Sequence, residues 1–138
     1  MTTLALAILV FLNGQKIEFG TVQPFLANGT LMVPLRAVCE KIGARVEPIP
    51  DSESIEIHGD EVEIEVRIGN ERAYVKNRHG ATLATLQMPA LTKKGRTFVP
   101  LRFITQSFDA EVTWENATRI ARITMKDEIK NQQQINNK

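Results

Sequence analysis

Four side chains able to bind a divalent cation lie close together in the middle of this 138-residue chain: Glu56, His58, Glu61 and Glu63. If Gly59-Asp60 forms a two-residue turn, His58 lies opposite Glu61 and Glu56 opposite Glu63 on one face of a hairpin. Carboxylates and imidazoles are ligands for Ca²⁺ and for transition metals. We favour the competing interpretation, a solvated strand face whose charges deter edge-to-edge pairing. We therefore expect no resident metal and no cofactor.

Arg36 and Arg102 are the next charged groups of interest, because each follows the residues Val-Pro-Leu. A cation in the first turn of a helix opposes the macrodipole by about 0.3–1 kcal/mol at an exposed site. Each arginine therefore needs a compensating carboxylate, backbone carbonyl or anionic ligand. Because both Val-Pro-Leu-Arg motifs carry the arginine, we favour a structural partner over a ligand for it. Glu40, one turn on, can serve Arg36, whereas Gln106 stands at the equivalent position for Arg102.

Trp114 is the only tryptophan of the chain and a candidate for stacking on a sugar ring. It alternates with Val112 on one strand face, which equally suits the core, so we expect a partly buried ring. Trp114, Arg36 and Arg102 form the candidate ligand-binding set. Cys39 lies on an apolar helix stripe, where a thiol behaves as a small hydrophobe.

A sequence repeat carries both arginines. Val33-Pro34-Leu35-Arg36 recurs as Val99-Pro100-Leu101-Arg102, and Ala44-Arg45-Val46 recurs at the same spacing as Ala110-Glu111-Val112. A repeat of this length indicates one supersecondary unit used twice. We place the two similar halves at about residues 7–58 and 68–125. A scaffold needs two copies of a unit more often than a catalytic centre does.

Two short helices follow the prolines of this repeat. Pro34 and Pro100 suit the first helical position, where a missing N–H costs nothing. Gly43 and Asp109 stand at the predicted ends, where a left-handed conformation is needed. Between these limits, apolar residues recur at i, i+3, i+4 and i+7: Leu35, Val38, Cys39 and Ile42, then Leu101, Ile104, Thr105 and Phe108.

Strands joined by hairpins account for the rest of the chain. Asn13-Gly14 is a strong hairpin signal, and residues 61–68 alternate with a period of two. Helix stripes cover the apolar faces of such sheets. The sequence predicts an α+β fold, mainly antiparallel, with one domain over residues 1–126 and a flexible Asn- and Gln-rich tail over 127–138.

Composition excludes several classes of function. With 17 basic and 16 acidic residues, the net charge of +1 gives no reason to expect a nucleic acid partner. A single cysteine excludes an internal disulfide. The apolar run Leu4 to Leu12 is too short to span a membrane, and no Lys or Arg precedes it as in a signal peptide. As a strand, this run is a candidate for pairing with another copy in a homodimer.

The chain resembles the copper amine oxidase N-terminal-like domain, also called the stalk domain. The resemblance rests on the paired Val-Pro-Leu-Arg motifs, the preceding Asn28-Gly29-Thr30 and the closing Glu111-Val112-Thr113-Trp114. It implies a non-catalytic module of exported and cell-surface bacterial proteins, built of antiparallel sheet wrapped around a helix. The chain departs from the pattern at Glu47-Pro48-Ile49, where a Trp is usual, and at Phe108-Asp109, where Leu-Gly is usual.

Copper chemistry does not transfer with this resemblance. The oxidase reaction needs a modified Tyr beside three His ligands, whereas this chain has one Tyr, Tyr74, and two His. We therefore expect no enzyme, and an extracellular or cell-surface location. The expected partners are other protein domains or a second copy, with cell-wall polysaccharide as the alternative. A metal-dependent hydrolase built on Glu56, His58, Glu61 and Glu63 is a third hypothesis.

Overall fold

The computed structural model describes residues 7–126, and these form thirteen strands and two helices. The predicted flexible tail and the first residues of the apolar run from Leu4 lie outside the described part. The helices are α1 (Leu35–Ile42) and α2 (Leu101–Ser107). The strands are β1 (Leu9–Leu12), β2 (Gln15–Lys16), β3 (Phe25–Ala27), β4 (Thr30–Pro34), β5 (Arg45–Pro48), β6 (Ser54–Gly59), β7 (Val62–Arg67), β8 (Arg72–Asn77), β9 (Gly80–Thr85), β10 (Leu91–Lys93), β11 (Arg96–Pro100), β12 (Ala110–Glu115) and β13 (Ile120–Met125).

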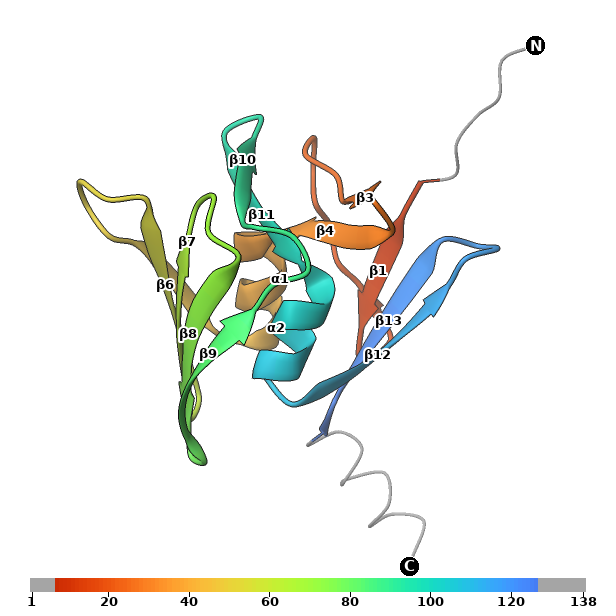
Figure 1. The fold of residues 1–138 in the computed structure, drawn as a ribbon. Coiled ribbons are helices and arrows are strands. Elements are labelled where there is room, and N and C mark those ends of the chain that lie inside the picture. The colour runs from red at the N-terminus through yellow and green to blue at the C-terminus, as the bar shows by residue number, and fades with distance from the viewer. Residues whose placement is uncertain (1–6, 127–138) are drawn as a thin grey trace, which may run out of the picture.

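The strands form three sheets around the two helices (Figure 1). Their orders are β12-β13-β1-β2, β10-β11-β4-β3 and β5-β6-β7-β8-β9. In Figure 1 the first and third sheets lie on opposite sides of α1 and α2, while β4 and β11 cross near one end of the helices. Every pair is antiparallel except β1 with β13. The prediction of an α+β fold with mainly antiparallel strands is therefore confirmed.

The parallel pair joins the first strand of the fold to the last. Leu9 lies opposite Ile120, and Leu12 lies opposite Ile123. The other side of β1 pairs with β2 through the predicted turn at Asn13-Gly14. Because strands occupy both sides of β1, the described part of this apolar run is not a free edge, so β1 is not available for the pairing with another copy that we considered.

Each helix begins one residue later than predicted. Pro34 and Pro100 have extended backbone, with ψ of 122° and 132°, and they end β4 and β11. The two prolines therefore close a strand, where the missing N–H removes no helical hydrogen bond. The end of α1 agrees with the prediction, because Gly43 (φ 105°) caps the helix in the left-handed conformation. The helix α2 ends one residue earlier than predicted, at Ser107, with Phe108 as its C-cap, and the left-handed Asp109 (φ 57°) follows.

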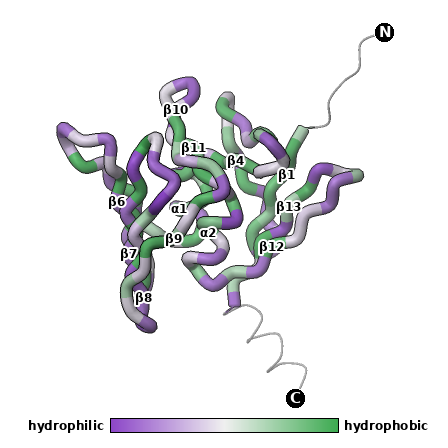
Figure 2. The backbone as a smooth tube through the Cα atoms, viewed as in Figure 1, coloured by the Kyte–Doolittle hydropathy of each residue, from purple (hydrophilic) through white to green (hydrophobic). Residues whose placement is uncertain are grey.

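The helices fill the space between the two outer sheets. The predicted stripes are buried at Leu35, Val38 and Cys39 of α1, and at Leu101, Ile104 and Thr105 of α2. The buried hydroxyl of Thr105 donates a hydrogen bond to the carbonyl oxygen of Arg102 at 3.0 Å. Figure 2 shows hydrophobic residues on the helices and on the strands that face them, whereas several outlying turns are hydrophilic. None of the described helices is long and apolar enough to cross a membrane.

Candidate functional site

Arg36 and Arg102 line two different cavities. The cavity beside Arg36, about 690 Å³, lies between α1, the segment that follows β2, and strands β5 and β6. The cavity beside Arg102, about 390 Å³, lies between α2, the β3–β4 turn and β12. We call them the Arg36 cavity and the Arg102 cavity. The two arginines therefore do not meet in one shared site.

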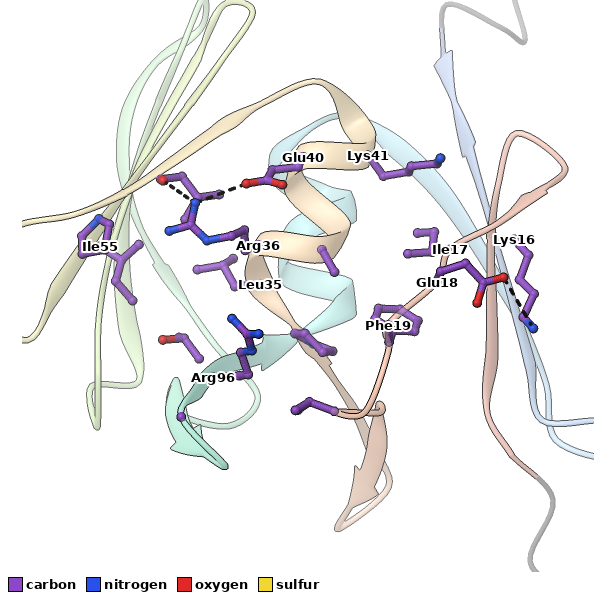
Figure 3. Close-up of a pocket in the computed structure, with 17 residues that line it drawn as sticks. Lys16, Ile17, Glu18, Phe19, Leu35, Arg36, Glu40, Lys41, Ile55 and Arg96 are labelled. Atoms are coloured by element: carbon purple, nitrogen blue, oxygen red, sulfur yellow. Dashed lines mark hydrogen bonds and ion pairs between the residues drawn. The ribbon is translucent and has the colours of Figure 1, made fainter.

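Arg36 is held by its own helix and by the neighbouring sheet (Figure 3). Its Nη1 donates to Oε1 of Glu40 at 3.2 Å and to the carbonyl oxygen of Val46 at 3.1 Å. The predicted partner Glu40 is thus confirmed. These contacts fix β5 to the first turn of α1, so Arg36 has a structural task.

Apolar and basic side chains share the wall of the Arg36 cavity. Figure 3 shows Ile17 and Phe19 on one side of α1 and Ile55 on the other. Lys41 and Arg96 add positive charge to the wall. The two carboxylates of the wall, Glu18 and Glu40, are each paired with a neighbouring cation, Lys16 and Arg36.

The Arg102 cavity brings together two residues of the predicted ligand-binding set. Arg102 from α2 and Trp114 from β12 both line it, with Gln87, Asn28 and Thr30 as further polar groups. No ion pair joins Arg102 to a carboxylate within residues 7–126. Trp114 is 37% exposed and is one of the exposed large hydrophobic side chains, so its ring is more open to solvent than the partly buried ring that we expected. An exposed aromatic ring beside convergent hydrogen-bonding groups is the arrangement that sugar and small-ligand sites use.

Sequence reasoning missed Gln87, Asn28 and Thr30 as parts of this cavity. Gln87 follows β9, while Asn28 and Thr30 belong to the β3–β4 hairpin. Asn28-Gly29-Thr30 entered the prediction only through the family resemblance, and no local pattern indicates that this segment approaches Trp114. Only the tertiary packing of three separate segments forms the cavity.

The charged hairpin has a different register from the predicted one. Its turn is Asp60-Glu61, so His58 lies opposite Glu63, and Glu56 lies opposite Glu65. Glu61 stands in the turn itself, with its carboxylate 3.8 Å from Arg78. The predicted pairings of His58 with Glu61 and of Glu56 with Glu63 are therefore wrong.

The glycine at position 59 explains this error. We read Gly59 as a turn residue, but it is the last residue of β6. A Cβ at this position would lie 2.5 Å from Cε1 of Phe108, closer than real Cβ contacts come. Gly59 therefore serves close packing of the strand against the ring that follows α2.

His58 is surrounded by carboxylates that do not converge on one point. Its Nδ1 contacts Glu63, and its Nε2 lies 3.4 Å from Glu56 and 3.6 Å from Glu47. The imidazole itself thus occupies the space between the acids. Across residues 7–126, no group of three or more His, Cys, Asp or Glu side chains is arranged to hold a metal ion.

The thiol of Cys39 is fully buried on the inner side of α1. Burial, with a smaller contribution from the charge of Glu40, raises the pKa of Cys39 to about 12. A thiol is nucleophilic only as the thiolate. Cys39 therefore acts as a small core residue, as its place on the apolar stripe predicts.

Comparison with known families gives one match. A family model described as the copper amine oxidase N-terminal domain matches residues 11–123. The matched region extends from β1 to β13, so it includes all three sheets and both helices. Searches of curated proteins and of solved structures found no match to the chain.

Proposed function

Because the chain belongs to the copper amine oxidase N-terminal domain family, we propose that it is a structural and interaction module of an exported or cell-surface bacterial protein and has no catalytic activity of its own. The N-terminal domain of copper amine oxidases is a non-catalytic domain. Family membership supports a role in positioning or spacing the parts of a larger protein. The location outside the cell belongs to the same proposal.

The observation that carries this proposal is the use of the Val-Pro-Leu-Arg motifs in packing. Val33 and Val99 lie opposite each other where β4 meets β11, and both are fully buried. Leu35 and Leu101 anchor the two helices in the core. Arg36 ties α1 to β5. Residues of the motif thus join the middle sheet, both helices and the five-stranded sheet.

We extend the proposal to an origin of the chain from two similar halves. The bounds of β3, β4 and β6 recur at a spacing of 66 residues in β10, β11 and β13. Val33 and Val99 are equivalent in the proposed repeat, and they lie opposite each other in the middle sheet. This pairing supports the proposal that the two halves meet there. A duplicated scaffold suits a spacer, since each half presents its own outer surface.

The test of location uses the organism's own protein. Intact cells are treated with a protease and then probed for the chain with an antibody. The proposal expects the protein in the cell-surface or secreted fraction and sensitive to the protease. A protein found only inside intact, protease-resistant cells would contradict it.

Binding of cell-wall polysaccharide is the second candidate function, and the Arg102 cavity favours it. Trp114 offers a ring face, and Arg102, Gln87 and Asn28 offer hydrogen-bond donors within the same cavity. A cavity of about 390 Å³ lies in the range of about 300–1,000 Å³ typical of small-ligand sites. A sugar ring stacked on Trp114 would have polar partners along its rim.

Retention on insoluble peptidoglycan and on glycan arrays tests this candidate. We expect Trp114→Ala to lower retention at least tenfold, because stacking on an aromatic ring supplies much of the affinity in such sites. Tyr74→Ala is the matched control, since Tyr74 is 42% exposed on a different sheet and does not line the cavity. Equal losses for the two variants, or no retention of the unaltered protein, would exclude this site.

A further inference from the structure

β9 is a long edge strand without a charged residue or a proline. It ends the five-stranded sheet, where β8 is its only strand partner among the described residues. Its sequence is Gly-Ala-Thr-Leu-Ala-Thr. Five of its six residues are exposed, and the sixth, Ala84, is half-buried. Such an edge offers unpaired N–H and C=O groups to any approaching strand.

The other edge strands of the described sheets are protected against pairing. β2, β3 and β10 have only two or three residues. β5 contains Arg45, Glu47 and Pro48, and β12 contains Glu111 and Glu115. Shortness, charge and proline are the usual devices that keep sheet edges apart. β9 has none of them, which sets it apart as an interaction surface.

The β8–β9 hydrogen bonds identify the free backbone groups. Just beyond the strand, the N–H of Leu86 donates to the carbonyl oxygen of Glu71 at 2.6 Å. Backbone groups alternate in direction along an antiparallel strand. The odd-numbered residues of β9 therefore direct their N–H and C=O groups away from β8. These residues are Ala81, Leu83 and Thr85.

We propose that β9 pairs antiparallel with β9 of a second copy of this chain, about a two-fold axis at Leu83. In this register Leu83 lies opposite Leu83 of the second copy, and Ala81 lies opposite Thr85 of the second copy. All three outward residues then exchange backbone hydrogen bonds. Any other register that keeps these outward residues opposite one another is shifted by two or more residues. In such a register at least one of the three outward residues has no opposite residue within β9 of the second copy. The two five-stranded sheets become one continuous sheet, an interface with the self-complementarity of a two-fold dimer.

The outer face of the sheet supports a second copy as the occupant. Leu83 is 62% exposed and lies directly across from Tyr74, which is also exposed. Pairing places the two Leu83 side chains together between the two Tyr74 rings, so an apolar row crosses the joint. The nearest charged side chains on this face, Arg72 and Lys76, belong to the neighbouring strand β8 and not to the edge strand β9.

Repulsion between those charges is weak in the proposed dimer. Arg72 of one copy and Lys76 of the other are separated by three strand spacings, about 14 Å. The Debye length is about 10 Å at 0.1 M salt. Like charges therefore do not oppose the pairing at physiological salt. An edge such as β12, in contrast, would bring its glutamates close to those of its counterpart.

This inference names the partner for the proposed interaction role, and the two can fail separately. A monomeric chain would overturn the pairing and leave the scaffold role and its cellular location unaffected.

Cysteine cross-linking of the full chain tests the register. Opposed residues of a hydrogen-bonded pair have Cα atoms about 5.5 Å apart, within the range of about 4.4–6.8 Å for disulfides. Under mild oxidation we expect Leu83→Cys to give a covalent dimer on a non-reducing gel. Ala81→Cys is the matched control, because in this register it lies four residues, about 13 Å, from its own counterpart. The native Cys39 is buried and does not compete.

Sedimentation velocity over a wide concentration range tests the pairing itself. We expect the unaltered chain to dimerise, and Leu83→Lys, which opposes two charges at the axis, to weaken the dimer at least tenfold. Thr113→Lys adds the same charge to the exposed part of edge strand β12 and should leave the dimer intact. Circular dichroism checks that each variant is folded. An unaltered chain that is monomeric throughout, a dimer equally sensitive to both substitutions, or equal cross-linking at positions 81 and 83 would overturn the proposal.

Discussion

Cys39 shows how burial governs the chemistry of a side chain. Its raised pKa, about 12, comes first from loss of solvation and then from the nearby charge of Glu40. The folded protein therefore holds the thiol proton more tightly than the unfolded chain does, whose ordinary value is 9.0. The resulting stabilisation is complete below pH 9 and is lost as the pH rises towards 12.

We predict that, as the pH rises above 9, the unaltered chain loses stability faster than its Cys39→Ala variant does. Between pH 9 and pH 11, the free energy of unfolding of the unaltered protein should fall relative to that of the variant by up to about 1.4 kcal/mol per pH unit. Urea unfolding of both proteins at several pH values measures it. Lysine titration affects both proteins alike, so it cancels. A difference that stays constant with pH would contradict the prediction.

At the level of single residues, sequence reasoning succeeded where partners are close along the chain. Glu40 was identified as the partner of Arg36 because residues four apart lie on one helix face. The second acceptor, the carbonyl oxygen of Val46, comes from the next strand and had no local signal. The same limit explains why Trp114 was proposed as a ligand residue while Gln87 and Asn28 were missed.

At the level of elements, Gly59 and Phe108 couple the central hairpin to the end of α2. The Phe108 ring leaves little room for a side chain at position 59, because its Cε1 lies 2.5 Å from where a Cβ would stand. Sequence reasoning treated this glycine as a turn signal, since glycine has both uses. The helices, by contrast, were predicted almost to the residue. Their periodic stripes and left-handed ends are local properties of the chain.

We predict that Gly59→Ala destabilises the protein by about 1–3 kcal/mol, the usual cost of overpacking. In a Phe108→Ala background the same substitution should cost much less, because the space next to residue 59 is then open. Denaturant unfolding of the four proteins of this double-mutant cycle measures the coupling. Additive losses would show that Phe108 is not what excludes a side chain from position 59.

At the level of the whole molecule, one continuous core connects the two outer sheets. The largest buried cluster includes Val10 and Ile123 of one outer sheet, Ile57 and Val66 of the other, and residues of both helices. Neither half can bury its apolar faces alone. The repeat predicted from sequence does not reveal this interdependence, because repeated motifs alone are equally compatible with two halves that fold separately.

We predict that the three sheets unfold together. Native-state hydrogen exchange should give the same highest free energy of opening for β7 and for β13, equal to the global free energy of unfolding. Fluorescence of Trp114 and far-ultraviolet circular dichroism should change at the same denaturant concentration. Two separate transitions would indicate that the outer sheets are independent units.

The pairing of β1 with β13 has a consequence for how the chain acquires its structure during synthesis. Leu9 leaves the ribosome long before its neighbour Ile120, because about 110 residues separate the two along the chain. Until Ile120 has emerged, the apolar face of β1, which carries the buried Val10, lacks its native strand partner. Contacts of such long sequence separation slow folding, and β1 and β13 are the paired strands farthest apart along the described chain. We therefore expect the β1–β13 pairing to form late in folding.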